Sequence, residues 1–535
     1  MAWKDSVKQS IRNWGTPLDY QQQVSASYQL PLNKLPIFDW VNADASYTGR
    51  YTWVRGTELE DGTSLGNTIT SNRQLNLNVA LNLVTLYNHV KALQKANKNN
   101  KGLLRVLMML RSVNISYRTQ YAMLLPGFMP NVGDMLGQNK TGSTLAPGLD
   151  FAFGLMGDGY IDKALSRNWL LQADSVSTPA NINLSKDLQI KALLEPIRDL
   201  KIDLTASRTD NRAKSVQYMY PGMPTTLSGS FNMTTISLRG ALAGMGNANN
   251  GYRSAAFDHF RELIPEFQQR VGQEYSAEVL IPAFLSAYTS GAGKSMAIFP
   301  SLTRLLPNWS IRYGGLSKLS WVKEHLKSLN LNHVYKSVYS VGSYVNTSYS
   351  TVSINEAFSP LLGVDATFQN DLTAKVEYRT TRVLNLSMTS VQLNESLSKD
   401  WVIGLAYKIR DFNLFGAKGN RRIAKAQTPR SAAPGAARQA SSARKTGVNH
   451  DLNLRMDVSL RKQAAITRDI ASGVSSASSG NSAFKFSFMA DYTLSRLLTL
   501  TAYFDSQTNT PLLASNSYPT TTYDFGLSMK FSLTR

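Results

Sequence analysis

The chain has 535 residues, with 57 lysines and arginines against 36 aspartates and glutamates, a net charge of +21 and no cysteine. The lack of cysteine excludes disulfides, thiolate metal sites and cysteine nucleophiles, and the lack of any run of eighteen apolar residues excludes a transmembrane helix. A basic chain suits nucleic acid, but only 17% of the residues are charged and much of the excess lies in one segment. We therefore expect no nucleic-acid partner.

One pattern of amphipathic strands runs through the sequence, without the change in composition that would separate domains. A soluble chain of this length would form about two to four domains, whereas this pattern predicts a single domain over 1–535. The first residues, Met1 to Ser6, contain no apolar h-region. A surface barrel would then have its signal upstream, in a longer chain; the alternative is that the chain is not a barrel.

The clearest strand of the N-terminal half lies at 75–83, where leucines and a valine alternate with asparagines and an alanine. Asparagine is depleted in ordinary strands, so its repetition opposite leucine fits the hydrated inner wall of a barrel. We predict that Asn76, Asn78 and Asn82 face the lumen.

The segment 126–187 is rich in glycine, proline, asparagine and serine, which predicts a long loop with one or two short strands. A β-hairpin follows, because apolar residues alternate on both sides of a turn at Glu195-Pro196. Another strand is predicted at about 227–239.

Residues 250–306 break the pattern of strands. Aromatic and aliphatic side chains recur there at helical spacing, from Phe257 to Val271, and Pro265 is expected to kink or start the helix. We expect this helical and irregular insertion to pack on neighbouring loops or inside the lumen. A partner-binding helix is the alternative.

Strands resume at 308–314, and from residue 372 onward they are regular enough to enumerate. The predicted strands are 372–379, 382–393, 400–410, 451–461, 482–494, 496–506 and 521–534. Bacterial barrels have short periplasmic turns and end on the periplasmic side. Counting back from the end places tight turns at Thr380-Thr381 and Ser495-Arg496 in the periplasm.

The insertion at 411–450 is basic and contains alanine, serine, proline and glycine between its charges, which predicts disorder. Its cations are Lys418, Arg421, Arg422, Lys425, Arg430, Arg438, Arg444 and Lys445. The simplest interpretation is a solvated loop. The alternative is electrostatic docking to an acidic periplasmic partner or to phosphate groups.

The final strand has the strictest rhythm in the chain, with apolar and polar residues in strict alternation over twelve positions. That exceeds the usual ~5–6 residues of a soluble strand and suffices for the ~9–11 tilted residues that cross a bilayer. A lysine at the lipid midplane costs roughly 2–4 kcal/mol, so Asp524 and Lys530 are predicted to face the lumen. The alternative for this stretch alone is an edge strand of a soluble β-sandwich. The predicted lipid-facing set is Tyr523, Phe525, Leu527, Met529, Phe531 and Leu533.

No catalytic, cofactor or metal motif emerges from the sequence. The segment from Ser290 to Ser295 resembles the end of a phosphate-binding loop, but Tyr288 occupies the position of its first glycine. The five histidines are not at ligand spacing, and no Gly-x-Ser-x-Gly elbow is present. We expect neither an enzyme nor a bound cofactor.

Several blocks of the sequence resemble the SprA/Sov family, the outer-membrane translocon of the type IX secretion system of Bacteroidetes. The blocks include LPLNKLPIFDW from Leu30, LKIDLTASR from Leu200, VLIPAFL from Val279, FSPLLGVD from Phe358 and VIGLAY from Val402. The ending from Asn509 to Arg535 also resembles the C-terminus of this family. The likeness begins at about residue 20 and is weakest in the basic insertion.

The resemblance implies that the chain is the C-terminal part of a much longer protein, a single-chain barrel of about 36 strands. It also implies secreted cargo proteins that pass the lumen folded, a PorV-type shuttle barrel and a periplasmic plug protein as partners, besides outer-membrane lipid. No catalytic residue or partner contact carries over.

The sequence therefore predicts an all-β fold, part of a very large transmembrane antiparallel β-barrel of the Gram-negative outer membrane, with long loops and a short helical insertion. The function expected is a protein-conducting channel. Two alternatives remain: a nutrient-uptake barrel of the TonB-dependent type, whose plug domain and TonB box are not visible, and a surface β-rich adhesin without a pore.

Overall fold

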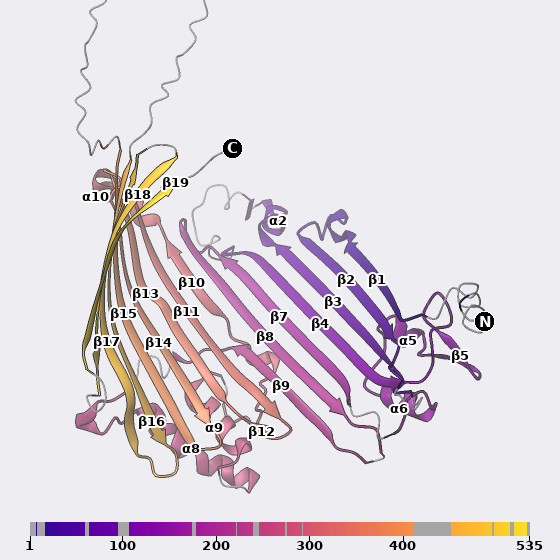
Figure 1. Ribbon diagram of the computed structural model, residues 1–535. Helices are drawn as coiled ribbons and strands as arrows, with labels where there is room; N and C mark the ends of the chain where they lie inside the picture. Colours follow the sequence, from indigo (N-terminus) through magenta and orange to yellow (C-terminus); the bar gives the residue numbers. More distant parts are fainter. Residues whose placement is uncertain are drawn as a thin grey trace, which may run out of the picture.

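The computed structural model describes residues 7, 17–58, 64–91, 93–94, 106, 108–173, 178–220, 222–238, 245–272, 275–291, 293–410, 412, 451–494, 497–513 and 518–531. This part of the chain is dominated by one antiparallel sheet of 17 strands (Figure 1). The strands are β1 (Asp19–Leu30), β2 (Val41–Val54), β3 (Asn67–Asn82), β4 (Leu110–Phe128), β7 (Ala180–Leu194), β8 (Leu200–Val216), β9 (Thr225–Thr234), β10 (Asn308–Tyr313), β11 (Leu326–Val345), β12 (Ser348–Tyr349), β13 (Val352–Phe368), β14 (Thr373–Ser387), β15 (Gln392–Ile409), β16 (Leu452–Asp469), β17 (Ser475–Thr493), β18 (Leu498–Pro511) and β19 (Thr520–Phe531).

Short helices and one small hairpin lie between these strands. The described α-helices are α2 (Leu83–Asn88), α5 (Leu149–Ala152), α6 (Tyr160–Ser166), α8 (Ala255–Val271), α9 (Ala277–Tyr288) and α10 (Ser320–His325). Four 3-10 helices, η1 (Pro31–Lys34), η2 (Ala248–Asn250), η3 (Leu302–Arg304) and η4 (Gly315–Lys318), and the hairpin of β5 (Asn139–Thr141) and β6 (Thr144–Ala146) complete the described elements.

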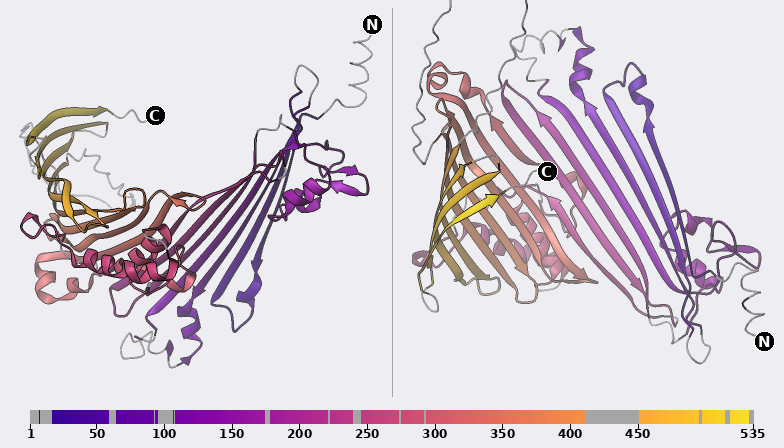
Figure 2. Two further views of the ribbon diagram at one scale, coloured as in Figure 1. Left: turned by 90° about the horizontal axis from the view of Figure 1, so that it is seen from below. Right: turned by 45° about the horizontal axis from the view of Figure 1, so that its top comes forward.

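The sheet is a curved meander in which each long strand pairs with the next long strand of the chain, except that β8 and β11 are joined through the short strands β9 and β10. The order runs from β1 through β2, β3, β4, β7 and β8 to β11, and then from β13 to β19. Figure 2 shows the C-terminal strands curling round so that the sheet has a concave and a convex face. Among the described residues, β1 pairs only with β2 and β19 only with β18, so both outer strands are edges.

Two short strands, β9 and β10, share one position in the sheet between β8 and β11. The register pairs β9 with the second half of β8 and β10 with its first half. On the other side, β11 pairs with β10 through Leu331 to Tyr335 and with β9 through Val338 to Val345. The chain therefore leaves the sheet partway along a strand at residue 235 and returns at residue 308 to complete it.

Two polar side chains accept hydrogen bonds from backbone N–H groups at this interruption. The Asn308 side chain accepts a hydrogen bond from the Ser337 backbone N–H at 2.8 Å, and Thr234 Oγ1 accepts one from the Ser207 N–H at 3.0 Å. Unpaired backbone groups are costly away from water. The two polar side chains thus stabilise the ladder where β9 stops and β10 begins.

The segment between β9 and β10 forms a helical cover on the convex face of the sheet (Figure 2). Its largest buried side chains pack on apolar residues of β9, β11, β13 and β14. The buried cluster includes Phe257, Phe260, Ile264 and Phe267 of α8, most of α9, and Phe231, Tyr339, Val341, Ile354 and Leu384 of the strands. A second cluster joins α5 and α6 to Tyr51, Trp53, Met123 and Ile182 of the N-terminal strands.

Several predictions from the sequence are confirmed by the strand pairing. The single antiparallel sheet is present, and the hairpin predicted around Glu195-Pro196 is formed by β7 and β8, with Leu194 opposite Ile202. The predicted strand at 227–239 is shorter, because β9 ends at Thr234 where the chain leaves the sheet.

Other predictions were wrong. Thr380-Thr381 is not a turn: both residues lie within β14, and the connection predicted at 394–399 lies within β15. The apolar rhythm fails there because the convex face carries Arg382 and Glu395 beneath the helical cover. The prediction for 126–187 is only partly wrong: the segment contains two short strands, β5 and β6, as expected, but it also contains α5 and α6, and β7 begins within it at Ala180.

The helical insertion also lies elsewhere than expected. We predicted packing on loops or inside the lumen, whereas α8 and α9 pack on the convex face. Pro265 lies inside α8. The eight cations of the basic insertion, the turn predicted at Ser495-Arg496, and Leu533 fall outside the described residues.

Candidate functional site

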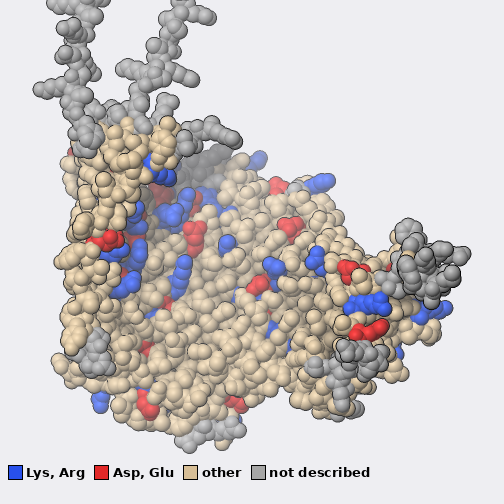
Figure 3. Space-filling model, viewed as in Figure 1, with Lys and Arg blue, Asp and Glu red and all other residues tan. Residues whose placement is uncertain are grey.

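The polar face of the sheet is the most extended candidate surface, and the register assembles it from residues far apart in the sequence. Directly paired residues share a face. Following partners strand by strand places Asn76 and Asn78 of β3 on the same face as Asp524 and Lys530 of β19. This is the concave face, toward the reader in Figure 1, and Figure 3 shows Lys, Arg, Asp and Glu distributed over it.

At the N-terminal end of the concave face, amides and hydroxyls form a ladder across three strands. Asn76 Nδ2 donates to Ser46 Oγ at 3.0 Å, and Asn78 Nδ2 donates to Asp44 Oδ2 at 2.9 Å. On the other side, Ser116 Oγ donates to Asn78 Oδ1 at 2.8 Å. These bonds give the asparagine side chains partners on the neighbouring strands, which explains why asparagine is tolerated here.

Asn82 has a different position from the other two asparagines. It is the last residue of β3, and its side chain accepts a hydrogen bond from the Thr85 backbone N–H at 3.4 Å as the N-cap of α2. Its place is therefore the rim of the sheet, where a capping side chain helps to start a helix.

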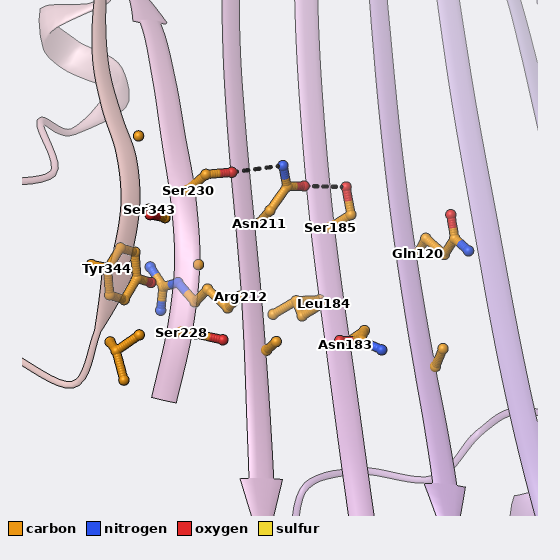
Figure 4. Close-up of a pocket in the computed structure, with 15 residues that line it drawn as sticks. Gln120, Asn183, Leu184, Ser185, Asn211, Arg212, Ser228, Ser230, Ser343 and Tyr344 are labelled. Carbon is orange, nitrogen blue, oxygen red and sulfur yellow. Dashed lines mark hydrogen bonds between the residues drawn. The ribbon is translucent and has the colours of Figure 1, made fainter. Parts of the chain in front are cut away.

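In the middle of the sheet, the concave face is hollowed above β7, β8 and β9 (Figure 4). Ser185 donates to Asn211 Oδ1 at 2.7 Å, and Asn211 Nδ2 donates to Ser230 Oγ at 3.2 Å. Small residues, including Ala122 and Ala213, leave room for a pocket of about 540 Å³. The side chains that line it on this face, such as Gln120, Asn183 and Asn211, are uncharged, whereas the side chain of Arg212 lies on the convex face beside Asp210.

The C-terminal half of the concave face is strongly charged. Lys375 Nζ lies 2.8 Å from Glu377 Oε1, and Arg379 Nε donates to Glu377 Oε2 at 2.9 Å. Arg461 Nε lies 2.9 Å from Asp400 Oδ1. Further along, Arg455 Nε lies 2.8 Å from Asp457 Oδ2. Charges of both signs alternate, so this surface is polar without a uniform sign.

The convex face carries the complementary apolar set. The described members of the terminal set, Tyr523, Phe525, Leu527, Met529 and Phe531, are 60–77% exposed. Leu75, Leu77, Leu460, Phe484 and Phe504 are also exposed large apolar side chains on this face. A row of exposed aromatic and aliphatic side chains of this extent marks an interaction surface.

Neither a metal-binding cluster nor the context of a phosphate-binding loop occurs among the described residues. No group of three or more His, Asp or Glu side chains is placed to hold a metal ion within the described ranges. The segment from Ser290 follows α9 rather than a strand, which is not the context of a phosphate-binding loop. None of the helices in the described part is long and apolar enough to cross a membrane.

Comparison with known proteins gives no family. No protein-family model matches the sequence, and no curated protein matches it. Among solved structures, the chain is similar to the ferric yersiniabactin uptake receptor FyuA of Yersinia pestis, with 8% identity and a TM-score of 0.24 over 92% of this chain and 59% of that one. It is also similar to the siderophore receptor PiuA of Acinetobacter baumannii, with 7% identity and a TM-score of 0.25 over 91% of this chain and 62% of that one.

The chain thus spans about 60% of the length of these two receptors. TM-scores this low do not establish a shared fold or a shared ligand. The fold rests on the strand pairing described above.

Proposed function

We propose that this chain forms part of the wall of a protein-conducting channel in the outer membrane, of the type that the type IX secretion system uses to export folded proteins. The observation that carries the proposal is the division of one long curved sheet into two faces. The concave face is polar from β2 to β19, and the convex face carries exposed large apolar side chains on strands from β3 to β19.

The dimensions of the sheet support a membrane-spanning wall. The longer strands have 12 to 20 residues, which exceeds the ~9–11 that a tilted strand needs to cross the hydrocarbon layer. In this proposal the predicted set from Tyr523 to Leu533 contacts lipid, while Asn76, Asn78, Asp524 and Lys530 line the lumen and Asn82 lies at its rim.

The two edges support a barrel larger than this chain completes. Unpaired backbone groups at an open edge are not tolerated in lipid, and β1 and β19 are edges among the described residues. Further strands of a longer protein would pair with them. The blocks that resemble the SprA/Sov family agree with this, and they bring secreted cargo, a PorV-type shuttle barrel and a plug protein into the proposal as partners.

Neighbouring residues on opposite faces give a matched test in the full-length protein. This chain contains no cysteine, so once any cysteine elsewhere in the full-length protein is replaced, Asn78→Cys and Leu77→Cys introduce single thiols one residue apart. In cells exporting a cargo that has been arrested by a fused, tightly folded domain, a thiol crosslinker should join the cargo to the thiol at position 78 and not to the thiol at position 77.

The same two variants separate a channel from the alternatives. A water-soluble maleimide should label the thiol at position 78. A fluorophore attached to the thiol at position 77 should be quenched by a lipid-soluble quencher. Equal crosslinking of both positions to cargo, or of neither in cells that export normally, would contradict the proposal of a protein-conducting lumen.

A further inference from the structure

A groove lies on the convex face of the sheet, between the two helical covers. It runs over the ends of β7, β8 and β9 and has a volume of about 390 Å³. Asp158, which follows α5, lies at one side and Phe299, which follows α9, lies at the other. Figure 2 shows α5 and α6 well separated from α8 and α9 on this side of the sheet.

One wall of the groove is aromatic. The ring centroids of Phe299 and Tyr344 are 5.5 Å apart, and those of Tyr344 and Tyr349 are 5.7 Å apart. Leu227 adds an aliphatic side chain that is half exposed. Aromatic side chains with one polar end are typical of the interface between hydrocarbon and water.

The floor of the groove is cationic. The period of two in β8 places Arg212 and Lys214 on the same face, and both line the groove. Arg212 is held in place because its Nε and Nη2 donate to Asp210 at 3.0 and 2.9 Å, yet the side chain is 57% exposed. A fixed guanidinium and an ammonium beside it form a receptor for an anion with several oxygens.

The cations border the apolar band of the same face. Lys186 of β7 is opposite Asp210, and beyond it β7 continues with Leu188 and Ile190 on the convex side. Along β8, Arg208 lies opposite Leu188, and the apolar residues Ala206 and Leu204 follow opposite Ile190 and Ala192. The row of positive charge therefore lies where an apolar surface ends, which is the position of headgroups along a membrane protein.

We propose that this groove binds an anionic phospholipid, with the headgroup phosphate on Arg212 and Lys214, the glycerol region against Tyr344 and Tyr349, and the acyl chains along the apolar band of β7 and β8. This inference rests on the proposed function in one respect, that the convex face contacts lipid. It adds a specific lipid site and a requirement for negative headgroup charge.

The test uses the full chain with its upstream strands in nanodiscs that contain phosphatidylcholine and phosphatidylglycerol. Native mass spectrometry of the released protein should find phosphatidylglycerol enriched over its share of the nanodisc. Arg212→Gln with Lys214→Gln should reduce that enrichment by about tenfold or more, because each cation near a headgroup contributes roughly 1 kcal/mol. Arg455→Gln with Lys485→Gln, an equal loss of charge on the concave face, should leave it unchanged.

Arg212 also pairs with the buried Asp210, so its replacement can disturb folding. Lys214→Gln alone leaves that pair intact and should still lower the enrichment severalfold. Unchanged enrichment of phosphatidylglycerol in both variants would overturn the lipid site. Loss of the bound phosphatidylglycerol when inorganic phosphate is added would also overturn it, because the groove would then be a site for free anions.

The two cysteine variants, in the same nanodiscs, report independently which face of the sheet meets water. Maleimide should label the thiol at position 78 and spare the thiol at position 77. A failure of the proposed function would appear in this labelling, whereas a failure of the lipid site would appear only in the lipid enrichment.

Discussion

Glu395 and Arg468 form a salt bridge in which neither side chain is exposed, with Arg468 Nη2 2.7 Å from Glu395 Oε2. A second arginine, Arg382, donates from Nε to Glu395 Oε1 at 2.7 Å. Arg468 also donates to the carbonyl oxygens of Met245 and Tyr252, at 3.0 and 2.5 Å, and both of these residues belong to the segment that covers the convex face. The charged group thus ties the helical cover to the wall of the sheet.

Removing one member of this buried group should strongly destabilise the protein. Arg468→Met leaves the Glu395 carboxylate with less compensation, and breaking a buried pair in this way costs about 3–5 kcal/mol. Urea unfolding of the purified protein, followed by tryptophan fluorescence, measures the change. The matched variant is Arg455→Met, whose pair with Asp457 is exposed, and it should cost at most about 1 kcal/mol. Equal losses in the two variants would mean that burial of the pair does not matter.

Arginine should be tolerated on only one face of the terminal strand. Leu527→Arg places a charge on the convex face and should cost roughly 2–4 kcal/mol if that face meets the hydrocarbon midplane. Ser528→Arg, one residue along, places it on the concave face and should be nearly neutral. The yield of folded protein in the membrane fraction, together with unfolding in the same lipid, compares them. A larger loss for the Ser528 variant would reverse the assignment of the faces.

The stability of the sheet at the interruption between β9 and β10 should depend on Asn308. Asn308→Leu removes the acceptor of the Ser337 N–H, and an orphaned buried donor costs about 1–3 kcal/mol. Ser310→Ala, two residues further along the same strand, is the control. Hydrogen exchange of the Ser337 amide provides the direct measurement: its protection should fall in the Asn308 variant and persist in the control. Unchanged protection would show that water or another group already satisfies this amide.

The contact between α8 and the segment after α9 should weaken in acid. Lys294 Nζ lies 2.6 Å from Glu266 Oε1, and Arg270 Nη2 lies 3.0 Å from the same oxygen. The hydrogen bond from Lys294, followed by the charges of Lys294 and Arg270, holds the pKa of Glu266 below its usual range. The contribution of Glu266 is therefore complete above its unfolded pKa of about 4.3 and is lost as the pH falls through the lower folded value.

Amide exchange around Lys294 should accordingly accelerate below about pH 4 relative to its intrinsic rate. In Glu266→Gln this pH dependence should disappear, since glutamine does not titrate. A variant that keeps the full acid response would assign it to another carboxylate.

The alternation of apolar and polar residues predicts the strands well where one face of the sheet is apolar and the other is polar. The alternation around Asn76 and in the terminal strand needs no long-range information, because the period of two alone sorts the side chains between faces. The hairpin of β7 and β8 is likewise local. The concave positions of Asn76, Asn78, Asp524 and Lys530 follow from the same alternation.

The errors arise where distant segments decide the environment. Arg382, Glu395 and Arg468 interrupt the apolar series of the convex face, and only the cover formed by residues 245–288 makes their burial possible. Likewise, β9 and β10 are separated along the chain by residues 235–307 and occupy one position in the sheet. No local pattern indicates that two strand-like segments are halves of one strand.

The shared position of β9 and β10 has a mechanical consequence. The first half of the chain contributes β9, which bonds to β11 of the second half, while the second half contributes β10, which bonds to β8 of the first. The two halves of the chain are therefore interlocked, because each contributes a short strand that pairs with a long strand of the other. A protease cut between residues 235 and 307 would break the covalent chain but leave the β9–β11 and β8–β10 pairings in place. The cleaved sheet would therefore keep its shape.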